Sequence, residues 1–271
     1  MRYCSLTFDI YAEILNIFKV LIGTKQESLI WEKKVSGVTV QVWEKEDRRE
    51  LRFGNHIMQS VFSRLKPDYL VLPYSRFMLL GLLFCPEPKS VLHIGLGGGS
   101  IARWLHREFP QLQQTVIEIN SAVIEAAYRF FELPRDKRLR MLCGDAVEMI
   151  PTLTEQYDLI ILDAFGDYGA PEELTRIEFL HNLRDCLRDD SWLLGNLWTV
   201  TGDFEERREQ WESTFSQVLE ARANRKGNVI LYGSKLSQLP EKKEFETTAK
   251  ILQKRHQLDF RKMLRELNKA K

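Results

Sequence analysis

The eleven residues Ser90-Val-Leu-His-Ile-Gly-Leu-Gly-Gly-Gly-Ser100 contain the clearest fold signal in this chain of 271 residues. They begin with a short apolar run, Val91 to Ile94, of the kind that forms a buried strand. Four glycines within five residues follow, and an amphipathic pattern begins at Ile101. A strand, a glycine turn and a helix N-terminus in this order bring backbone N–H groups toward a ligand. The turn therefore predicts a site for a nucleotide or nucleoside.

Strand-like and helical patterns alternate from Ser90 to about Tyr232. The strand-like runs are Val91–Ile94, Thr115–Ile119, Leu139–Cys143, Leu159–Leu162, Trp192–Asn196 and Val229–Tyr232. The helical patterns between them are Ile101–Phe109, Ser121–Phe131, Ala146–Leu153, Arg176–Leu187 and Phe204–Val218. Such alternation predicts an α/β domain with a mostly parallel sheet and helices on both faces. Ligands of these sheets bind beyond the carboxyl ends of the strands.

A different pattern precedes this region, within residues 29–84. Val35–Trp43 and Glu50–Gly54 alternate at period two around a charged turn, which predicts a small antiparallel sheet. We expect a loose connection from Met58 to Leu72. Tyr74 to Phe84 is apolar at helical spacing and ends before Pro86, which predicts a connecting helix.

The two ends of the chain form separate segments in this interpretation. Residues 1–28 contain an apolar stretch at helical spacing, interrupted by charges. Residues 240–271 are rich in lysine and arginine and carry apolar residues at helical spacing, which predicts a helix that docks on the domain or on a partner subunit. Residues 85–239 are left as the main α/β domain.

Composition narrows the classes of function. The chain is 44% hydrophobic and 28% charged, and its formal net charge of +1 argues against nucleic-acid binding through bulk electrostatics. Ile10 to Gly23 is too short and too charged to span a bilayer and lacks the features of a signal peptide. The four cysteines are widely spaced, which is typical of reduced thiols and leaves no zinc-ligand spacing. We therefore expect a cytoplasmic protein with no metal and no membrane or nucleic-acid partner.

Acidic residues end three successive strand-like runs. Glu118 ends the second, about twenty residues beyond the glycines, where a carboxylate can accept from both ribose hydroxyls. Asp145 ends the third, where it can accept from an adenine amino group while Ala146 leaves room for the base; it can also cap the next helix. Asp163 ends the fourth. An adenosine-type ligand with a positive centre explains these carboxylates better than a dinucleotide does.

These motifs together resemble the spermidine synthase (polyamine aminopropyltransferase) family, a branch of the class I S-adenosylmethionine-dependent methyltransferase superfamily. The resemblance runs from about Val35 to Tyr232 and rests on His93-Ile-Gly-Leu-Gly-Gly-Gly99, Val116-Ile-Glu-Ile119, Gly144-Asp145 and Tyr157-Asp-Leu-Ile-Ile-Leu-Asp163. It implies a Rossmann-like fold with a mostly parallel seven-stranded sheet, preceded by a small antiparallel β domain. It also implies a homodimer that works in polyamine biosynthesis.

The resemblance further implies roles for individual residues. Asp163 would orient and deprotonate an attacking amine, with Asp167 and Tyr74 beside it in the catalytic centre. The amine would displace the thioether from a sulfonium donor, so a carboxylate base in a partly desolvated pocket is required. The residues expected at the donor are Gln59, Gly95, Gly97, Gly98, Gly99, Glu118, Ile119, Asp145, Ala146 and Asp163.

The sequence departs from the family pattern at several positions. Gly98 stands where the family carries an aspartate that contacts the aminopropyl group. The loop after the catalytic aspartate reads Asp163-Ala-Phe-Gly-Asp167, so the second aspartate of the family is displaced by one residue. Tyr74-Ser75-Arg76 replaces a tyrosine followed by His or Gln and then Glu, and the region of Asn196 replaces a glutamine.

Three functions are compatible with this pattern. The first is transfer of an aminopropyl group from decarboxylated S-adenosylmethionine to a small-molecule amine, with Asp163 as the base. The second is methyl transfer from S-adenosylmethionine to a small-molecule nucleophile, in which Gly98 makes room for the cofactor carboxylate and Arg76 faces it. The third is nucleoside binding without catalysis. Aromatic residues after Asp163, Phe165 and Tyr168, can close over the substrate in either reaction.

Overall fold

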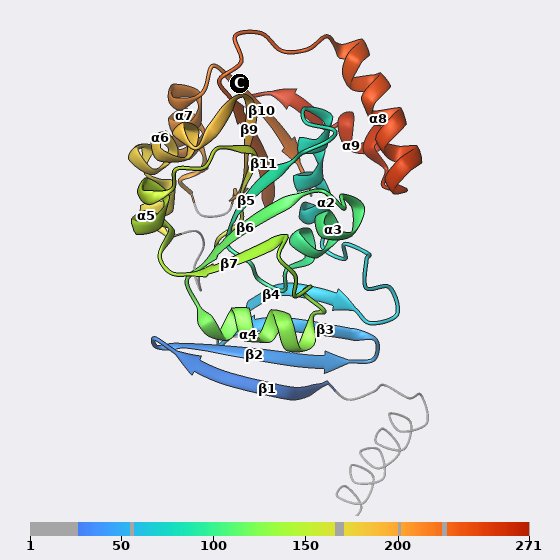
Figure 1. Ribbon diagram of the computed structural model, residues 1–271, viewed down its shortest axis with the longest axis vertical. Helices are drawn as coiled ribbons and strands as arrows, with labels where there is room; N and C mark the ends of the chain where they lie inside the picture. Colours follow the sequence, from blue (N-terminus) through green and yellow to red (C-terminus); the bar gives the residue numbers. More distant parts are fainter. Residues whose placement is uncertain (1–26, 55–56, 166–170, 200–201, 224–226, 271) are drawn as a thin grey trace, which may run out of the picture.

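The computed structural model describes residues 27–54, 57–165, 171–199, 202–223 and 227–270, which form two sheets (Figure 1). The smaller sheet is antiparallel, with strand order β1-β2-β3-β4. Its strands are β1 (Ser28–Val35), β2 (Val38–Lys45), β3 (Arg48–Phe53) and β4 (Ile57–Ser63). The predicted antiparallel sheet is thereby confirmed. Residues 1–26 of the expected N-terminal helical segment (residues 1–28) lie outside the described residues, and Ser28 already belongs to β1.

Two details of this sheet differ from the prediction. Ser36 and Gly37 have positive φ values and form a tight turn, so Val35–Trp43 is not one strand but part of a hairpin. The expected loose connection from Met58 to Leu72 is also wrong in its first part, because residues 57–63 pair with β3 as β4. The tertiary pairing, rather than the modest strand pattern of this segment, decides its structure.

The larger sheet has eight strands in the order β12-β10-β11-β9-β8-β5-β6-β7. Its strands are β5 (Ser90–Ile94), β6 (Gln113–Glu118), β7 (Leu139–Cys143), β8 (Tyr157–Leu162), β9 (Leu187–Trp198), β10 (Gln217–Arg222), β11 (Asn228–Ser234) and β12 (Leu267–Lys269). The neighbours from β7 to β9 are parallel, and the pairings that involve β10, β11 and β12 are antiparallel.

The strand count corrects the expectation of seven strands. The eighth strand, β12, is contributed by the C-terminal tail, whose Leu267 is paired in register with Ala221 of β10. β10 begins at Gln217, so the helical pattern expected to reach Val218 ends earlier. A three-residue edge strand carries too few residues for its period to be recognised in the sequence.

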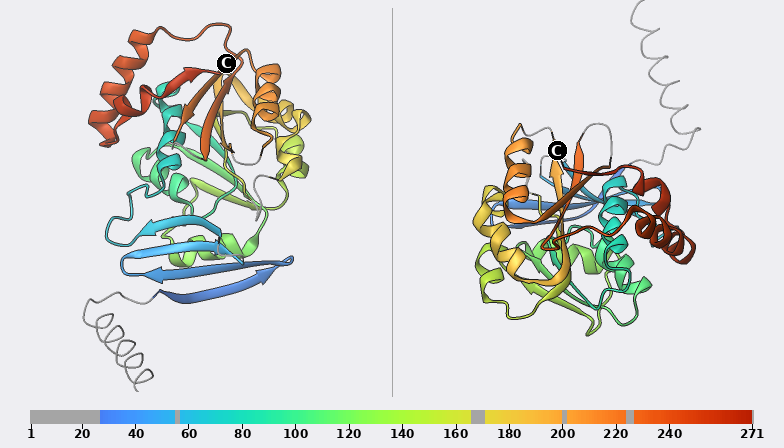
Figure 2. Two further views of the ribbon diagram at one scale, coloured as in Figure 1. Left: turned by 180° about the vertical axis from the view of Figure 1, so that it is seen from behind. Right: turned by 90° about the horizontal axis from the view of Figure 1, so that it is seen from above.

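Helices cover both faces of the larger sheet, as Figure 1 and Figure 2 show. One face is covered by α5 (Ala146–Met149), α6 (Ile177–Asp185) and α7 (Phe204–Thr214), with the 3-10 turns η2 (Ile150–Thr152) and η3 (Glu172–Thr175). The other is covered by α2 (Pro73–Met78), η1 (Leu79–Leu83), α3 (Ser100–Glu108), α8 (Lys242–His256) and α9 (Phe260–Leu264). Between the two sheets lies α4 (Ser121–Phe130), whose apolar side packs on the smaller sheet.

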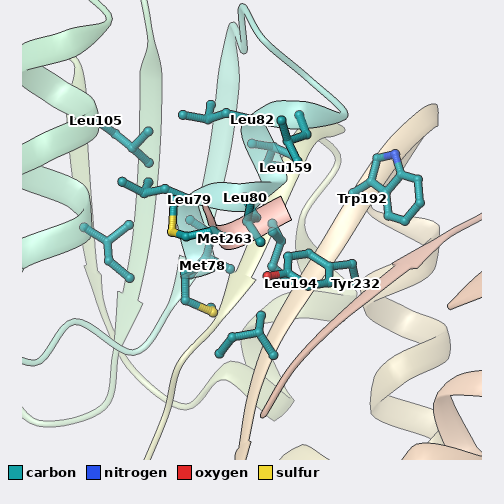
Figure 3. Packing of buried hydrophobic residues seen from close by; sticks show 14 of the residues in the cluster. Met78, Leu79, Leu80, Leu82, Leu105, Leu159, Trp192, Leu194, Tyr232 and Met263 are labelled. Carbon is teal, nitrogen blue, oxygen red and sulfur yellow. The ribbon is translucent and has the colours of Figure 1, made fainter. Parts of the chain in front are cut away.

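The predicted connecting helix consists of α2 and the 3-10 turn η1, and it packs on the larger sheet rather than on the smaller one. Figure 3 shows its apolar side chains against side chains from several elements of that sheet and its cover: Met78, Leu79, Leu80, Leu82, Leu105, Leu159, Trp192, Leu194, Tyr232 and Met263. Gly81 approaches Leu194 so closely that a Cβ would overlap this leucine. This packing fixes Tyr74, in the first turn of α2, relative to the ends of the central strands.

The basic tail docks on the same face. Its buried residues Ala249, Leu252, Phe260 and Met263 join the main core, and His256 Nδ1 lies 2.6 Å from Glu108 Oε2 of α3. The tail is thus helical over α8 and α9 and packs on the domain, whereas residues 267–269 form β12 rather than a helix. In the described ranges, no helix combines the length and the apolar composition that a membrane span requires.

The glycine turn meets the end of β8 at the carboxyl edge of the larger sheet. Gly95 N donates to Ile117 O at 2.9 Å, and Asp163 N donates to Ile94 O at 2.9 Å, so the ends of β5, β6 and β8 are held together. Gly95 has a φ of 88°, and a Cβ added there would overlap the carbonyl oxygen of Asp163 and lie 2.8 Å from its carbonyl carbon. Only glycine fits both conditions.

Alanine substitutions at two glycines test this contact. Gly37 has a φ of 85° with no atom within 4 Å of an added Cβ, so Gly37→Ala reports the backbone strain alone. We expect it to lower the free energy of unfolding by about 1–3 kcal/mol. Gly95→Ala should cost about 1–3 kcal/mol more, because the Asp163 backbone must move. Urea unfolding measures both; equal losses for the two variants would contradict the contact.

Candidate active site

A cavity of about 710 Å³ opens at the carboxyl ends of β5, β6, β7, β8 and β9. It contains most of the residues that the sequence predicted: Gln59, Tyr74, Gly95, Gly97, Glu118, Ile119, Asp145, Ala146 and Asp163. Gln59 reaches it from β4 of the smaller sheet and Tyr74 from α2, so both sheets and the connecting helix form its walls. The elements far apart in the sequence therefore converge on one site.

Glu118, at the end of β6, binds the glycine turn directly. Its Oε2 accepts a hydrogen bond from Leu96 N at 3.0 Å, and its Oε1 accepts one from Asn120 N at 2.9 Å. Burial raises the pKa of this carboxyl above its ordinary value, and the backbone N–H groups counteract part of that rise. Each oxygen keeps a lone pair for a further donor, so Glu118 can accept from two neighbouring hydroxyl groups.

The next two strand ends provide a place for a flat ring. Asp145 Oδ1 caps α5 by accepting from Val147 N at 2.8 Å, which leaves its other carboxyl oxygen for a ligand. Ala146 is buried beside it, and its small side chain leaves room. Ile119 is 67% exposed although it is a large apolar residue, and it lines the same wall of the cavity. An apolar surface beside a carboxylate suits a base that carries an amino group.

The glycines of the turn divide into two groups. Gly95 and Gly97 line the cavity, but Gly98 and Gly99 are buried and do not. Gly98 N donates to Ser60 Oγ at 2.7 Å, and a Cβ at this position would lie 2.9 Å from the Phe131 ring and 3.0 Å from Ser60 Cβ. Gly99 precedes α3 as its N-cap residue. The prediction that Gly98 and Gly99 contact the donor does not match this placement; they shape the turn instead.

The carboxylate of Asp163 is surrounded by uncharged hydrogen-bond donors. Asn196 Nδ2 donates to Asp163 Oδ1 at 2.9 Å, and the hydroxyl of Tyr74 donates to the same carboxylate. Burial raises the pKa of Asp163 above its ordinary value, while these two hydrogen bonds lower it in part. The pKa of Tyr74 is raised well above its usual range by burial and by the Asp163 charge, so Tyr74 stays a donor. A carboxylate in this environment can accept a proton from a ligand.

An aromatic pair continues the cavity beyond this carboxylate. Phe165 follows Asp163 by two residues, Trp198 follows Asn196 by two, and their rings stack with centroids 5.0 Å apart. Both rings line the cavity. At the end of β8 and at the end of β9, a polar side chain is thus followed two residues later by an aromatic side chain that lines the same cavity. Asp167 and Tyr168, which were expected nearby, lie outside the described residues.

Ser60 and Asn228 are among the cavity residues that sequence reasoning missed. Ser60 lies in β4 and meets the glycine turn, and Asn228 begins β11 and donates to Asn196 Oδ1 at 2.9 Å. The segment around Ser60 gave no clear strand signal. A signal for Asn228 did exist, because a polar residue precedes the apolar run Val229–Tyr232, at the end where an antiparallel strand meets the carboxyl edge.

The structure also corrects the position of Arg76. Its guanidinium lies over the Tyr69 ring, 5.4 Å from the ring centroid, and Arg76 does not line the cavity. It therefore does not face the donor as the methyl-transfer interpretation expected. Among the side chains that the structure describes, no group of three or more His, Cys, Asp or Glu residues could hold a metal ion.

Comparisons with known proteins agree with this architecture. Among solved structures, a probable spermidine synthase from Corynebacterium glutamicum superposes with a TM-score of 0.72 at 20% identity, covering 83% of this chain and 88% of that one. Human methyltransferase-like protein 13 in complex with SAH superposes with a TM-score of 0.65 at 21% identity, covering 68% and 92%. At these identities the likeness establishes the fold, a Rossmann-like fold of the methyltransferase type.

Sequence comparisons are more specific. A polyamine aminopropyltransferase of Neisseria meningitidis serogroup A is 32% identical over 231 residues, which cover 83% of this chain and 87% of the relative. A family model described as the spermine/spermidine synthase domain matches residues 74–220, more than half of the chain. The match spans nearly all of α2, the glycine turn and the ends of β5, β6, β7, β8 and β9 at the cavity. The chain therefore belongs to the spermine/spermidine synthase family.

Proposed function

We propose that this protein transfers an aminopropyl group from decarboxylated S-adenosylmethionine to a small-molecule amine. The observation that carries the proposal is the charge of the cavity. Of the described residues that line it, five are acidic and none is Lys, Arg or His: Glu118, Asp145, Glu148, Asp163 and Glu173. A donor with a sulfonium and an ammonium group, and an acceptor with an ammonium group, are the cations that such a cavity attracts.

The adenosine part of the donor fits the wall formed by β6 and β7. Glu118 would accept from the two ribose hydroxyls, and Asp145 would accept from the adenine amino group above Ala146. Ile119 would cover one face of the base, a role that suits so large an exposed apolar side chain. Gln59 would approach from β4. SAH, the ligand of the human structural neighbour, carries the same nucleoside.

The chemistry then takes place at Asp163. The acceptor ammonium loses a proton to the Asp163 carboxylate, and the neutral nitrogen attacks the carbon of the propyl chain that is bonded to the sulfonium. A carbon–nitrogen bond forms as the carbon–sulfur bond breaks, and the electron pair of that bond returns to sulfur. Methylthioadenosine leaves as a neutral thioether. Tyr74 and Asn196 hold the carboxylate in one orientation, so the base is aligned before the acceptor arrives.

Methyl transfer has less support from the site. It was favoured by the space that Gly98 leaves and by the charge of Arg76. Gly98 is packed between Ser60 and Phe131, and Arg76 lies over Tyr69, so neither residue offers a place for the carboxylate of S-adenosylmethionine. A non-catalytic role is not favoured either, because Asp163 keeps two hydrogen-bond donors in a cavity large enough for two ligands.

The remaining expectations about context belong to the same proposal. We infer a cytoplasmic homodimer that uses no metal, nucleic acid or membrane. The near-neutral charge supports the absence of a nucleic-acid partner, and the wide spacing of the cysteines supports a reducing compartment; the homodimer rests on the family resemblance.

The first prediction concerns the base. Purified protein with decarboxylated S-adenosylmethionine and a panel of amines should release methylthioadenosine, measured by chromatography. Asp163→Asn should lower kcat by about 10²–10⁴-fold, since it removes the proton acceptor. Activity should fall as the pH decreases through the pKa of Asp163, which burial raises above its ordinary value. Glu173→Gln, an exposed acid of the same cavity, is the control and should change kcat little. Silence with every amine would refute the proposal.

The second prediction concerns donor binding. Glu118→Gln replaces a carboxylate that accepts from two hydroxyls by an amide that can accept through one oxygen only. Methylthioadenosine should bind about 10–100-fold more weakly, the loss of a hydrogen bond to a charged group. Glu148→Gln, at an exposed acid of the same cavity, should bind it as the wild type does. Titration calorimetry measures both, and equal affinity for wild type and Glu118→Gln would exclude the ribose contact.

A further inference from the structure

Asp163 and two asparagines form a hydrogen-bonded chain across neighbouring strands. Asp163 follows β8, Asn196 lies in β9 and Asn228 begins β11, and the sheet order places these strands side by side. Asn228 Nδ2 donates to Asn196 Oδ1 at 2.9 Å, and Asn196 Nδ2 donates to Asp163 Oδ1 at 2.9 Å. All three residues line the cavity, and Asn196 is 5% exposed.

The register of β9 and β11 explains why the two asparagines meet. Asn196 is paired with Ile230, and Asn228 is paired with Trp198, so the asparagines are diagonal neighbours of an antiparallel pair. Asn228 therefore contacts the amide of Asn196 from the side opposite to Asp163. The carboxylate lies beyond the parallel neighbour β8, where it also accepts from Tyr74.

An asparagine side chain has one end that accepts and one that donates. Asn228 donates to the Asn196 oxygen, so the Asn196 nitrogen is the atom left to face Asp163. A rotation of this amide by half a turn would place its oxygen against the carboxylate and leave two acceptors facing each other. The bond from Asn228 therefore selects between a favourable and an unfavourable contact at the base.

We propose that Asn228 is a positioning residue for the transfer reaction, which fixes the amide orientation of Asn196 and so keeps a hydrogen-bond donor on Asp163. The inference rests on the proposed function, in which Asp163 is the base. It adds a requirement in β11, beyond the residues 74–220 that match the family model. Asn228 acts through Asn196 and does not itself receive the proton.

Few other ionisable groups face Asp163. Tyr74 of α2 donates to it, and His93 of β5 lines a small adjoining cavity of about 30 Å³ that Tyr74 and Asp163 also line. Burial lowers the pKa of His93 to about 4, so this imidazole is neutral at the pH of an assay. The other acids of the main cavity lie at other positions along its walls: Glu118, Asp145, Glu148 and Glu173.

The test is the acid limb of the pH profile of kcat/KM for methylthioadenosine release. An ionised aspartate at position 228 can only accept, so in Asn228→Asp the Asn196 nitrogen turns toward residue 228 and its oxygen toward Asp163. The acid limb should move upward by about 1 pH unit or more, because Asp163 loses a donor to its charged form. Asn228→Ala adds no charge and frees the amide, so it should give a smaller shift in the same direction. An unchanged limb in both variants would overturn the proposal.

A double variant separates the hydrogen bonds from the added charge. Asn196→Leu removes the amide, so Asn228→Asp in that background acts on Asp163 only through space. The proposal expects a much smaller shift there than in the chain with Asn196. A shift of equal size in both backgrounds would mean that the charge added at position 228 alone is responsible. It would overturn the positioning role of Asn228.

A second readout does not depend on turnover. A carboxyl whose pKa is raised on folding stabilises the folded state below its unfolded pKa, and this contribution is lost as the pH rises through the folded pKa. In urea unfolding, the free energy of unfolding of the protein is compared with that of Asp163→Asn over a range of pH. The pH at which the protein loses stability relative to this variant reports the titration of the Asp163 carboxyl. Asn228→Asp should move that pH upward as well. If this shift is seen without any aminopropyl transfer, the proposed function is disproved and the positioning role of Asn228 stands. If transfer is seen without the shift, the positioning role is disproved and the proposed function stands.

Discussion

The close contact between the glycine turn and the backbone of Asp163 is the constraint on which the site depends. β5 and β8 are hydrogen-bonded neighbours, and the missing side chain of Gly95 lets the Asp163 carbonyl approach the turn. The same turn offers Leu96 N to Glu118. One loop therefore positions both Glu118 and Asp163, the carboxylates to which we assign the donor ribose and the transferred proton. Their separation is a property of the parallel sheet rather than of long, flexible side chains.

The second feature of the site is that its acids are held by neutral donors. Glu118 accepts from backbone N–H groups, and Asp163 accepts from Asn196 and Tyr74. A nearby lysine or arginine would stabilise these carboxylates more strongly, but it would also cancel the charge that attracts a cationic donor and acceptor. Hydrogen bonds from neutral groups make burial tolerable and leave the negative charge in place. In the same arrangement, burial keeps the pKa of Asp163 above its ordinary value, as the proposed base requires.

The sequence predicted the features that depend on local patterns. The glycine turn, the parallel strands around it and the acids at the strand ends follow from short apolar runs that end in polar residues. It did not predict β4 or β12, whose pairing partners decide their structure, nor Ser60 and Asn228, which reach the cavity from other parts of the chain. Gly98 is instructive, because its sequence context indicated an open position, whereas Ser60 and Phe131 fill the space around it.

The negative cavity should select the decarboxylated, more cationic donor over S-adenosylmethionine itself. The most direct measurement is one reaction that contains both compounds at equal concentrations, with an amine acceptor, followed by mass spectrometry of the product. We expect an acceptor that has gained an aminopropyl group and no methyl group. A methylated acceptor without the aminopropyl product would contradict this selection and would assign the site to the other branch of chemistry that this fold supports.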